Sequence, residues 1–469
     1  MFSSDKTIDN NGRPIGRPLP FQHNCCFSAE YYSNSLEVLE TAINEASAYQ
    51  SWKVFDPGRG NSIDERYAAM PTLTKRDIRE HFPQGFLPAD RDVSRGLASG
   101  EIEFVETSGS TGDSVTNIWN QKWWDASERA SLKLNSHTSR VATGSHPEAI
   151  LVSPLNVGIV SDDIDLEIEK RRLSRFLYLN EKSNPLSWTP QHMDRMIREL
   201  EIFEPVSLEA NPSFLARLCR YILTSKKKVF QPALIVFTYE YPMNLHLRQI
   251  SRVFHSPLIS SYGTTEVGCV FMQCEKGKFH QNTESCRVDY QPLKPEHGGP
   301  TLGRVLVTTF KNPWYLILRF DVGDLVQRDN ENECSCGRDS GLILSAIEGR
   351  TANITFTVNG RIVTLRELDN AISVLEGIDE YQLRQISPNE YRLHLVTQRS
   401  DKNLLQDKAK EILNELYGKE AELSIIFEKA ISPSVSGKYN ISQTLFPVNI
   451  EDYLDDRYVR KRAELKVSR

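Results

Sequence analysis

Apolar positions along the chain follow helical spacing first and strand spacing later. Leu36, Leu39 and Ile43 recur at helical intervals, which predicts a helix over residues 35–46. Thr74 precedes a second short helical stretch and is of a type that caps helix N-termini. From about residue 101, apolar segments alternate with helical ones, as in EIEFVETSG, AILVSPL, PSFLARLCRYIL, PALIVFTYE and SPLISSYG. This alternation predicts a doubly wound α/β domain.

The pattern shortens after Gly349. Strand-like segments such as NITFTV and YRLHLV alternate with helix-like ones, and one predicted helix carries an apolar stripe of Leu405, Ala409, Ile412 and Leu416. We therefore expect three parts: a large α/β domain over residues 1–348, a small α+β domain over 349–447, and a basic, helical, solvated extension over 448–469.

Composition narrows the class of protein. The 469 residues include 56 Lys and Arg against 62 Asp and Glu, a net charge of −6, which argues against a strongly basic nucleic-acid binder. No apolar run is long enough to span a membrane, and the N-terminus is polar. Eight cysteines are too few for a disulfide scaffold of this length. We expect a globular cytoplasmic protein that binds neither nucleic acid nor membranes.

A loop rich in glycine and hydroxyl groups is the first candidate for chemistry. Residues 107–112 read TSGSTG and follow an apolar strand. Glycines let backbone N–H groups approach phosphate oxygens, and hydroxyls add donors. The loop lacks the Gly-Lys-Ser/Thr ending of a Walker motif. A Ser/Gly turn can also be purely structural, so this loop needs a second element beside it.

The second element is the turn over residues 262–266, YGTTE, which again follows an apolar strand. A carboxylate beside two hydroxyls can hold Mg²⁺ on a nucleotide phosphate, and the aromatic residue can lie against a base or an acyl group. Asp324 ends the strand RFDVGD and suits ribose hydroxyls, while Arg350 and Lys438 lie near the two ends of the small domain. The strand-end turns, including TYEYP at 238–242, are expected to converge on one site.

These ordered motifs resemble the adenylate-forming superfamily of acyl-CoA synthetases, luciferases and peptide-synthetase adenylation domains. AMPTLTKRDIREHF over residues 69–82, the compact N-terminal region and the cysteine pattern make the chain most similar to the phenylacetate-CoA ligase branch. The resemblance covers about residue 30 to about residue 447. It implies that a small aromatic carboxylic acid reacts with ATP to give acyl-AMP, and that a thiol, CoA above all, then takes the acyl group.

The resemblance also implies a role for each motif residue. ATP phosphates would be wrapped by the loop residues Ser108, Gly109, Ser110, Thr111 and Gly112. The nucleotide would be bordered by Glu240, Tyr241, Tyr262, Gly263, Thr264 and Thr265, and its ribose would be held by Asp324 and Arg350. The catalytic residues would be Thr111 as a phosphate donor, Glu266 as the Mg²⁺ ligand, and Lys438 as the mobile lysine that reaches the carboxylate and the α-phosphate.

Three positions depart from the family pattern. Asp113 follows the phosphate loop where Lys is common, so one cation on the pyrophosphate side is missing. Tyr239 stands before Glu240 where relatives have small residues, and Ala352 occupies the expected hinge. The acceptor could therefore also be a carrier protein or an amine, and a non-catalytic zinc-stabilised scaffold is a third alternative. A homodimer is left open.

Four residues have the composition of a metal site. Cys274 and His280 are separated by five residues, and Cys334 and Cys336 follow about sixty residues later. A closed Cys₃His set suits structural Zn²⁺, because no position stays open for water. The alternative is four unligated residues with the cysteines packed as small apolar groups. Two further cysteines stand in reserve as ligands, Cys269 and Cys286.

The remaining candidates receive structural interpretations. Trp123 and Trp124 are expected to pack the helix that follows the phosphate loop rather than to line an acyl pocket. That pocket is expected around residues 153–157 and Tyr262. His192 has no obvious acidic partner in the sequence and is given no catalytic role.

Overall fold

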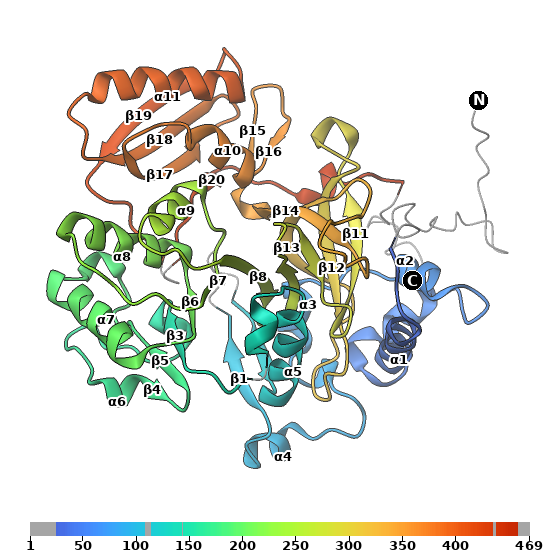
Figure 1. The fold of residues 1–469 in the computed structure, drawn as a ribbon. Helices are drawn as coiled ribbons and strands as arrows, with labels where there is room; N and C mark the ends of the chain where they lie inside the picture. Colours follow the sequence, from blue (N-terminus) through green and yellow to red (C-terminus); the bar gives the residue numbers. More distant parts are fainter. Residues whose placement is uncertain (1–24, 108–113, 143, 435–437, 458–469) are drawn as a thin grey trace.

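One long mixed sheet organises the large domain (Figure 1). The computed structural model describes residues 25–107, 114–142, 144–434 and 438–457; the predicted phosphate-loop residues Ser108–Gly112 therefore lie outside the described residues. The sheet has twelve strands in the order β11-β12-β13-β14-β10-β9-β8-β7-β6-β3-β5-β4. Their bounds are β3 (Glu148–Leu151), β4 (Arg172–Leu173), β5 (Phe176–Tyr178), β6 (Ser207–Ala210), β7 (Leu234–Phe237), β8 (Leu258–Thr264), β9 (Gly268–Gln273), β10 (Phe279–Gln281), β11 (Cys286–Pro292), β12 (Leu302–Thr309), β13 (Phe320–Arg328) and β14 (Ile343–Arg350).

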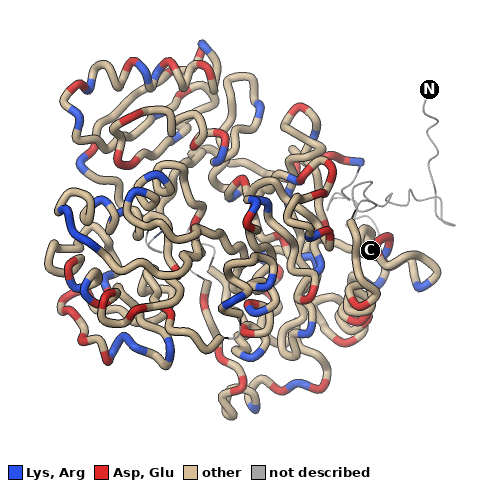
Figure 2. Tube along the Cα trace, viewed as in Figure 1, with Lys and Arg blue, Asp and Glu red and all other residues tan. Residues whose placement is uncertain are grey.

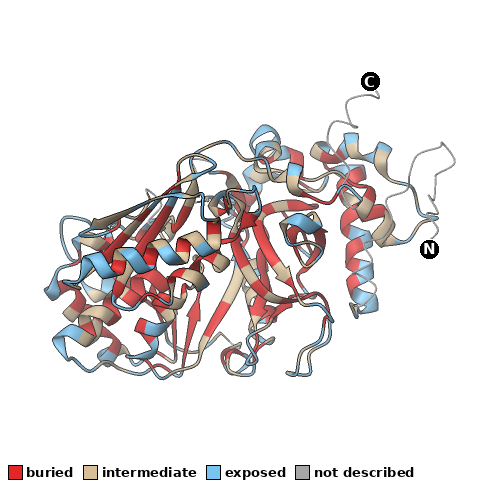
Figure 3. Cartoon of the chain, turned by 90° about the horizontal axis from the view of Figure 1, so that it is seen from above, coloured by how far each residue is buried: buried red, intermediate tan, exposed pale blue. Residues whose placement is uncertain are grey.

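The strands β5, β3, β6, β7 and β8 run parallel, and β9 to β14 continue the sheet with antiparallel pairings. One face of the parallel half packs against the helices α7 (Pro190–Phe203) and α8 (Pro212–Ser225) through a buried apolar cluster. Figure 3 shows this layering, with buried residues along the strands and exposed residues on the outer sides of the helices. The predicted doubly wound α/β architecture is confirmed.

The N-terminal part of the chain adds helices and one hairpin beside this sheet. The predicted helix over 35–46 is part of a longer helix, and Thr74 accepts a hydrogen bond from the Asp77 N–H as the cap of α3. The described elements are α1 (Ala29–Glu45), α2 (Ile63–Ala69), α3 (Lys75–His81), α4 (Val93–Ala98), β1 (Glu103–Glu106), β2 (Thr116–Trp119), α5 (Gln121–Leu132), α6 (Ile168–Arg171) and α9 (Asn244–Ser251).

A second, four-stranded sheet with the order β19-β18-β17-β20 forms the small α+β domain. Its elements are β15 (Thr355–Phe356), β16 (Ile362–Val363), α10 (Leu365–Ile372), β17 (Ile378–Gln385), β18 (Glu390–Thr397), α11 (Lys402–Tyr417), β19 (Glu422–Glu428) and β20 (Ser442–Thr444). The buried stripe of α11 is Leu405, Ala409, Leu413 and Tyr417; the predicted Ile412 and Leu416 lie at its edge and are only partly buried.

The first part of the predicted basic extension, residues 448–457, is not a solvated helix, and its remaining residues, 458–469, lie outside the described residues. Residues 448–457 contain one short 3-10 turn, Ile450–Tyr453, and return to the large domain. Leu454 is 1% exposed because it covers an apolar cluster shared by both domains. Lys294 N–H donates to the Tyr453 carbonyl at 2.9 Å, and Asp455 N–H donates to Pro292 at 3.0 Å. This segment therefore fastens the end of the small domain to β11.

Charges of both signs are interspersed along the described chain (Figure 2). Among the described residues, no helix is long and apolar enough to cross a membrane.

The Leu454→Ala variant tests the contact between residues 448–457 and the apolar cluster that both domains share. Leu454→Ala opens a cavity in the cluster between the two domains, so we expect a loss of stability of about 2–4 kcal/mol. Denaturation followed by circular dichroism measures it. Leu404→Ala, at a position 51% exposed on α11, is the matched control and should leave the midpoint nearly unchanged. Equal midpoints for the two variants would contradict the docking of this segment.

Candidate functional site

A cavity of about 2120 Å³ lies between the carboxyl ends of the parallel strands and the small domain. The turns after β7 and β8 both open into it, as does Thr107, the last described residue before the phosphate loop. Every predicted nucleotide-site residue that the structure describes lines it: Glu240, Tyr241, Tyr262, Gly263, Thr264, Thr265, Glu266, Asp324, Arg350 and Lys438. The structure thus brings together residues that are up to 198 positions apart, as the range 240–438 gives 438 − 240 = 198.

Asp324 is held in this cavity by a hydroxyl and a guanidinium group. The Tyr262 hydroxyl donates to its Oδ2 at 2.7 Å, and Arg350 Nε lies 3.3 Å from its Oδ1. Asp324 and Arg350 are opposite each other in the pairing of β13 with β14. The Asp324 charge raises the pKa of Arg350, and burial followed by the same charge raises the pKa of Tyr262 well above its usual value. Both neighbours therefore stay protonated and hold Asp324 as a hydrogen-bond acceptor.

Lys438 enters the cavity from the small domain. It lies between β19 and β20, and its carbonyl accepts hydrogen bonds from the backbone and side chain of Ser434 at 2.8 Å each. Burial, and then the nearby Arg350 charge, lower the pKa of its ammonium group, whereas Glu240 and Asp324 favour the charged form. The ammonium group therefore lies among the charges of the large domain.

Glu240 holds the lysine segment against the large domain. Its Oε1 accepts the Tyr439 N–H at 3.2 Å, and its Oε2 accepts the Ser213 hydroxyl of α8. Burial raises the pKa of Glu240, and these two hydrogen bonds oppose that shift. Tyr439, the residue after Lys438, is thereby hydrogen-bonded to Glu240 in the turn that follows β7.

Glu266 has a cationic neighbour that the sequence analysis missed. The carboxylate is 3% exposed, and Lys75 Nζ, from the first residue of α3, lies 3.8 Å from its Oε1. One turn further along α3, Arg79 donates to the Ser114 carbonyl at 3.4 Å. Lys75 lies in the segment TLTKRD, whose sequence predicts a capped helix and a family resemblance but does not show which face of the helix meets Glu266.

The far end of the cavity lies between the sheet and α5, and here one prediction is wrong. Trp123 packs inward and donates from Nε1 to the Phe310 carbonyl at 2.9 Å, but Trp124 lines the cavity and lies 4.3 Å from the ring of Trp119. Adjacent helix positions are rotated by about 100°, so the two tryptophans cannot share one face. The expected acyl-pocket residues 155–157 also line this end.

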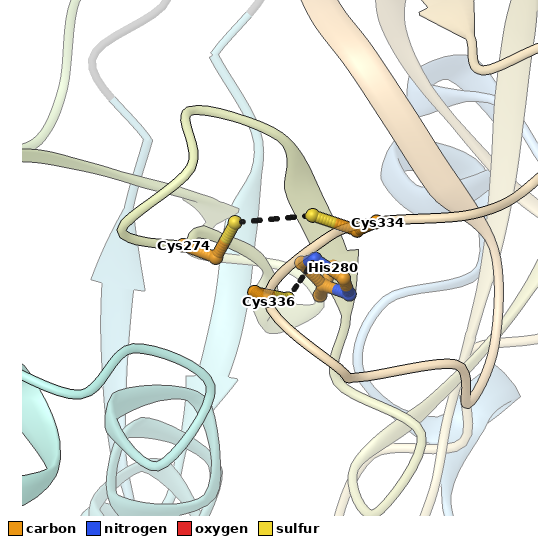
Figure 4. A group of neighbouring side chains, drawn as sticks. All are labelled: Cys274, His280, Cys334 and Cys336. Atoms are coloured by element: carbon orange, nitrogen blue, oxygen red, sulfur yellow. Dashed lines mark hydrogen bonds between the residues drawn. The ribbon is translucent and has the colours of Figure 1, made fainter.

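The predicted metal ligands form one cluster (Figure 4). The ligand atoms of Cys274, His280, Cys334 and Cys336 all lie within 4.8 Å of one another. Cys274 Sγ is 3.7 Å from Cys334 Sγ, and Cys336 Sγ is 3.3 Å from His280 Nε2. The reserve cysteines, Cys269 and Cys286, lie outside this cluster.

A second group of possible ligands is Asp165, Glu181 and His192. Contrary to the sequence analysis, His192 has an acidic partner, because its Nδ1 lies 3.3 Å from Asp165. Arg195 donates to Glu181 from both terminal guanidinium nitrogens, and Lys182 Nζ lies 3.1 Å from Asp165. The carboxylates are already neutralised, so this group is an ion-pair network.

Comparison with solved structures decides the fold. A 2-hydroxyisobutyryl-CoA ligase in the postadenylation state, in complex with R3-HIB-AMP, matches with a TM-score of 0.66 and 16% identity over 90% of this chain and 91% of that chain. The chain has the fold of the adenylate-forming enzymes. The same ligase in its thioesterification state, with 2-HIB-AMP and CoA, matches with a TM-score of 0.52 and 16% identity, over 91% of this chain and 92% of that chain.

Sequence comparison is less informative. No family model matches the chain. Protein CapK of Staphylococcus aureus is 24% identical over 377 residues, which is 79% of this chain and 78% of that protein. The adenylate-forming fold therefore rests on structural similarity, and the assignment of individual residues rests on the geometry of the cavity.

Proposed function

We propose that this protein is an ATP-dependent carboxylic acid ligase. The acid's carboxylate oxygen bonds to the α-phosphorus of ATP, the bond to the β-phosphate oxygen breaks, and pyrophosphate leaves. A thiol, most simply that of CoA, then attacks the acyl carbon and releases AMP. The observation that carries the proposal is the presence of Lys438 from the small domain in one cavity with Glu266 and Asp324 from the large domain and with Arg350, the last residue of β14.

The charges of the cavity suit the first step. A carboxylate that attacks a phosphate must overcome like-charge repulsion, and negative charge develops on oxygens in the transition state. Lys438 would contact the carboxylate and the α-phosphate. Lys75, near Glu266, would supply the cation that Asp113 does not provide on the pyrophosphate side.

The remaining nucleotide contacts follow from which groups can accept or donate. Asp324, held as an acceptor, would bind the ribose hydroxyls beside Arg350, and Glu240 and Tyr241 would border the adenine. Mg²⁺ fits Glu266, because its buried carboxylate faces the cavity and oxygen ligands suit this ion. When bound, Mg²⁺ would neutralise phosphate charge. Aromatic side chains at the far end, including Trp119, Trp124 and Tyr178, favour an aromatic acid.

A carrier-protein thiol or an amine is the second candidate acceptor. The second step needs the small domain to move, and two features bear on that movement. Ala352 stands at the expected hinge, and residues 448–457 fasten the small domain to β11. An acceptor other than CoA would require a different rearrangement. The assay of the second half-reaction therefore compares CoA, a carrier protein and an amine as acceptors.

The Lys438→Ala variant separates the two half-reactions. Without the ammonium group the variant should release pyrophosphate from acid and ATP at least about 100-fold more slowly, while still converting synthetic acyl-AMP with the correct acceptor. Pyrophosphate release and thioester formation are measured separately, with CoA, a carrier protein or an amine supplied. Lys429→Ala, at an exposed position of the small domain, is the control. Equal loss of both steps in a folded Lys438→Ala protein would contradict this role.

The Lys75→Ala variant tests the phosphate-side cation. Loss of a charge that faces the phosphates should lower kcat/KM for ATP by about 10- to 100-fold. The matched control is the next residue, because Arg76 is exposed and pairs with Glu80 at 2.7 Å on the outer face of α3. Arg76→Ala should retain wild-type kinetics. If both variants behave alike, Lys75 has no direct role.

We propose that Zn²⁺ occupies the Cys₃His cluster. Two sulfur ligands with zinc bonds of about 2.3 Å are about 3.8 Å apart in a tetrahedron, and the observed Cys274–Cys334 separation is 3.7 Å. The ligands come from β10 and from the loops after β9 and β13, so the ion would tie these segments together.

Elemental analysis should find about one zinc per chain. Cys336→Ser removes one ligand and should lower the zinc content and the melting temperature. Cys26→Ser, an exposed cysteine outside the cluster, should change neither. Protein prepared without chelator that contains no zinc would refute the metal assignment.

A further inference from the structure

Charged residues occupy the face of the parallel sheet that α5 covers. Glu148 pairs with Ser207 and Ile150 with Glu209, so Glu148 and Glu209 lie on the same face of neighbouring strands. The strand β6 is central, with β3 and β7 on its two sides. Central strands of parallel sheets are normally apolar on both faces, because both are covered. A glutamate in the middle of β6 is costly to fold and calls for a functional reason.

A third carboxylate faces these two from α5. Glu128 lines the same cavity as Glu148 and Glu209, at the end beside Trp124. Repulsion between the carboxylates contributes to the raised pKa values of two of them. Burial, and then the charge of Glu148, raise the pKa of Glu128 to about 7 and that of Glu209 to about 8.

The described residues provide donors for two of these carboxylates and none for the third, Glu128. Glu148 is bound by Arg175 at 2.7 Å and lies 3.2 Å from His146 Nε2, and Glu209 accepts the hydroxyls of Thr238, at 3.0 Å, and of Tyr239. Glu128 has no hydrogen bond or ion pair with the described residues, and only the more distant charges of Arg175 and His146 oppose the rise of its pKa. Among the described residues, the cationic contacts of these three acids are therefore Arg175 and, when it is protonated, His146, and both are made to Glu148.

A separate observation indicates that a ligand completes this end of the cavity. Ser131, almost one turn along α5 from Glu128, is 0% exposed and lines the cavity. Its hydroxyl has no hydrogen-bond partner among the described residues. A fully buried hydroxyl without a partner is uncommon in native proteins and is readily explained by a polar group that binds beside it.

The position along the sheet fixes which end of the substrate would meet the acids. Through the pairings of β6, β7 and β8, Glu209 lies level with Val236 and Ile259. Tyr262 and the following turn are three residues further along β8, which is about 10 Å. The group bound by Glu209 would therefore be remote from the carboxylate that reacts beside Lys438.

We propose that the acid activated here carries a protonated amine at the end remote from its carboxylate, and that Glu128 and Glu209 bind this ammonium group. The inference rests on the proposed ligase function and names its substrate class. An ammonium group supplies three hydrogen-bond donors and one positive charge, which the carboxylate group of Glu128 lacks. Trp119 and Trp124 provide aromatic surface for the rest of the substrate. α-Amino acids do not fit, because their ammonium group lies next to the carboxylate.

Matched acids test the inference. The pairs are 4-(aminomethyl)benzoate against 4-ethylbenzoate, and 6-aminohexanoate against heptanoate. The wild-type protein should release pyrophosphate with a kcat/KM about 10- to 100-fold higher for the amine of at least one pair. The preference should grow as pH rises through about 7 to 8, because the raised carboxyl groups ionise there while the amine stays protonated.

The variants Glu128→Gln and Glu209→Gln should each lose this preference, with little change for the neutral acid. Both should melt no lower than the wild-type protein, since the substitution removes repulsion between carboxylates. Glu204→Gln, an exposed position at the end of α7, is the control and should keep the preference. A wild-type preference for the neutral acids, or a preference that survives in both variants, would overturn the proposal.

Calorimetric binding of the two amines distinguishes this failure from failure of the ligase function. Amine binding that Glu128→Gln and Glu209→Gln abolish would support the site even if no acid releases pyrophosphate. Pyrophosphate release with neutral acids alone, without amine binding, would leave the ligase function standing and refute the ammonium site.

Discussion

The hydrogen bond from the Tyr439 N–H to Glu240 positions the lysine segment of the small domain on the large one. Further hydrogen bonds join the domains, among them those from Arg220 to the Asp379 carbonyl at 2.8 Å and from the Asn244 N–H to Asp369 at 2.7 Å. Glu240 lies at the carboxyl end of β7, where a parallel sheet exposes its strand-end turns. Because Tyr439 follows Lys438 directly, this contact also determines where the lysine enters the cavity. The nucleotide-side geometry depends on it, since Asp324 and Arg350 meet the lysine only in this arrangement of the domains.

The balance between cations and carboxylates differs between the two ends of the cavity. Lys75, Arg350 and Lys438 gather near Glu266 and Asp324, where phosphates would bind. At the other end, carboxylates outnumber the cation that contacts them. This difference would orient the substrate class proposed above, which carries opposite charges at its two ends, with its carboxylate toward Lys438. The orientation of such a substrate would then be set before reaction by charge and hydrogen bonding.

Much of this architecture follows from local patterns. The alternation of apolar segments is enough to predict the α/β fold, and the spacing of Cys274, His280, Cys334 and Cys336 is enough to group four residues that fold together. The contact between Lys75 and Glu266 could not be predicted, because the two residues are 191 positions apart (266 − 75 = 191) and local sequence patterns do not indicate such distant pairs.

Other features depend on which side of an element faces the cavity. Glu209 lies in a short apolar strand, and only the pairing of β6 with β3 shows that it meets Glu148. Trp123 and Trp124 are adjacent on α5 and therefore point in different directions, so that Trp123 packs inside the large domain while Trp124 lines the cavity. The docking of Leu454 needs the position of the large domain, so the segment around it resembled a solvated extension in sequence.

Transfer of isotopic oxygen tests the central claim of adenylation most directly. The protein would be incubated with ATP, Mg²⁺, an acceptor and a carboxylic acid whose carboxylate carries oxygen-18. If the carboxylate attacks the α-phosphorus and the acceptor then attacks the acyl carbon, one labelled oxygen leaves with each AMP. We predict AMP with a single oxygen-18 and unlabelled pyrophosphate. Label in inorganic phosphate with formation of ADP, or unlabelled AMP, would contradict the account.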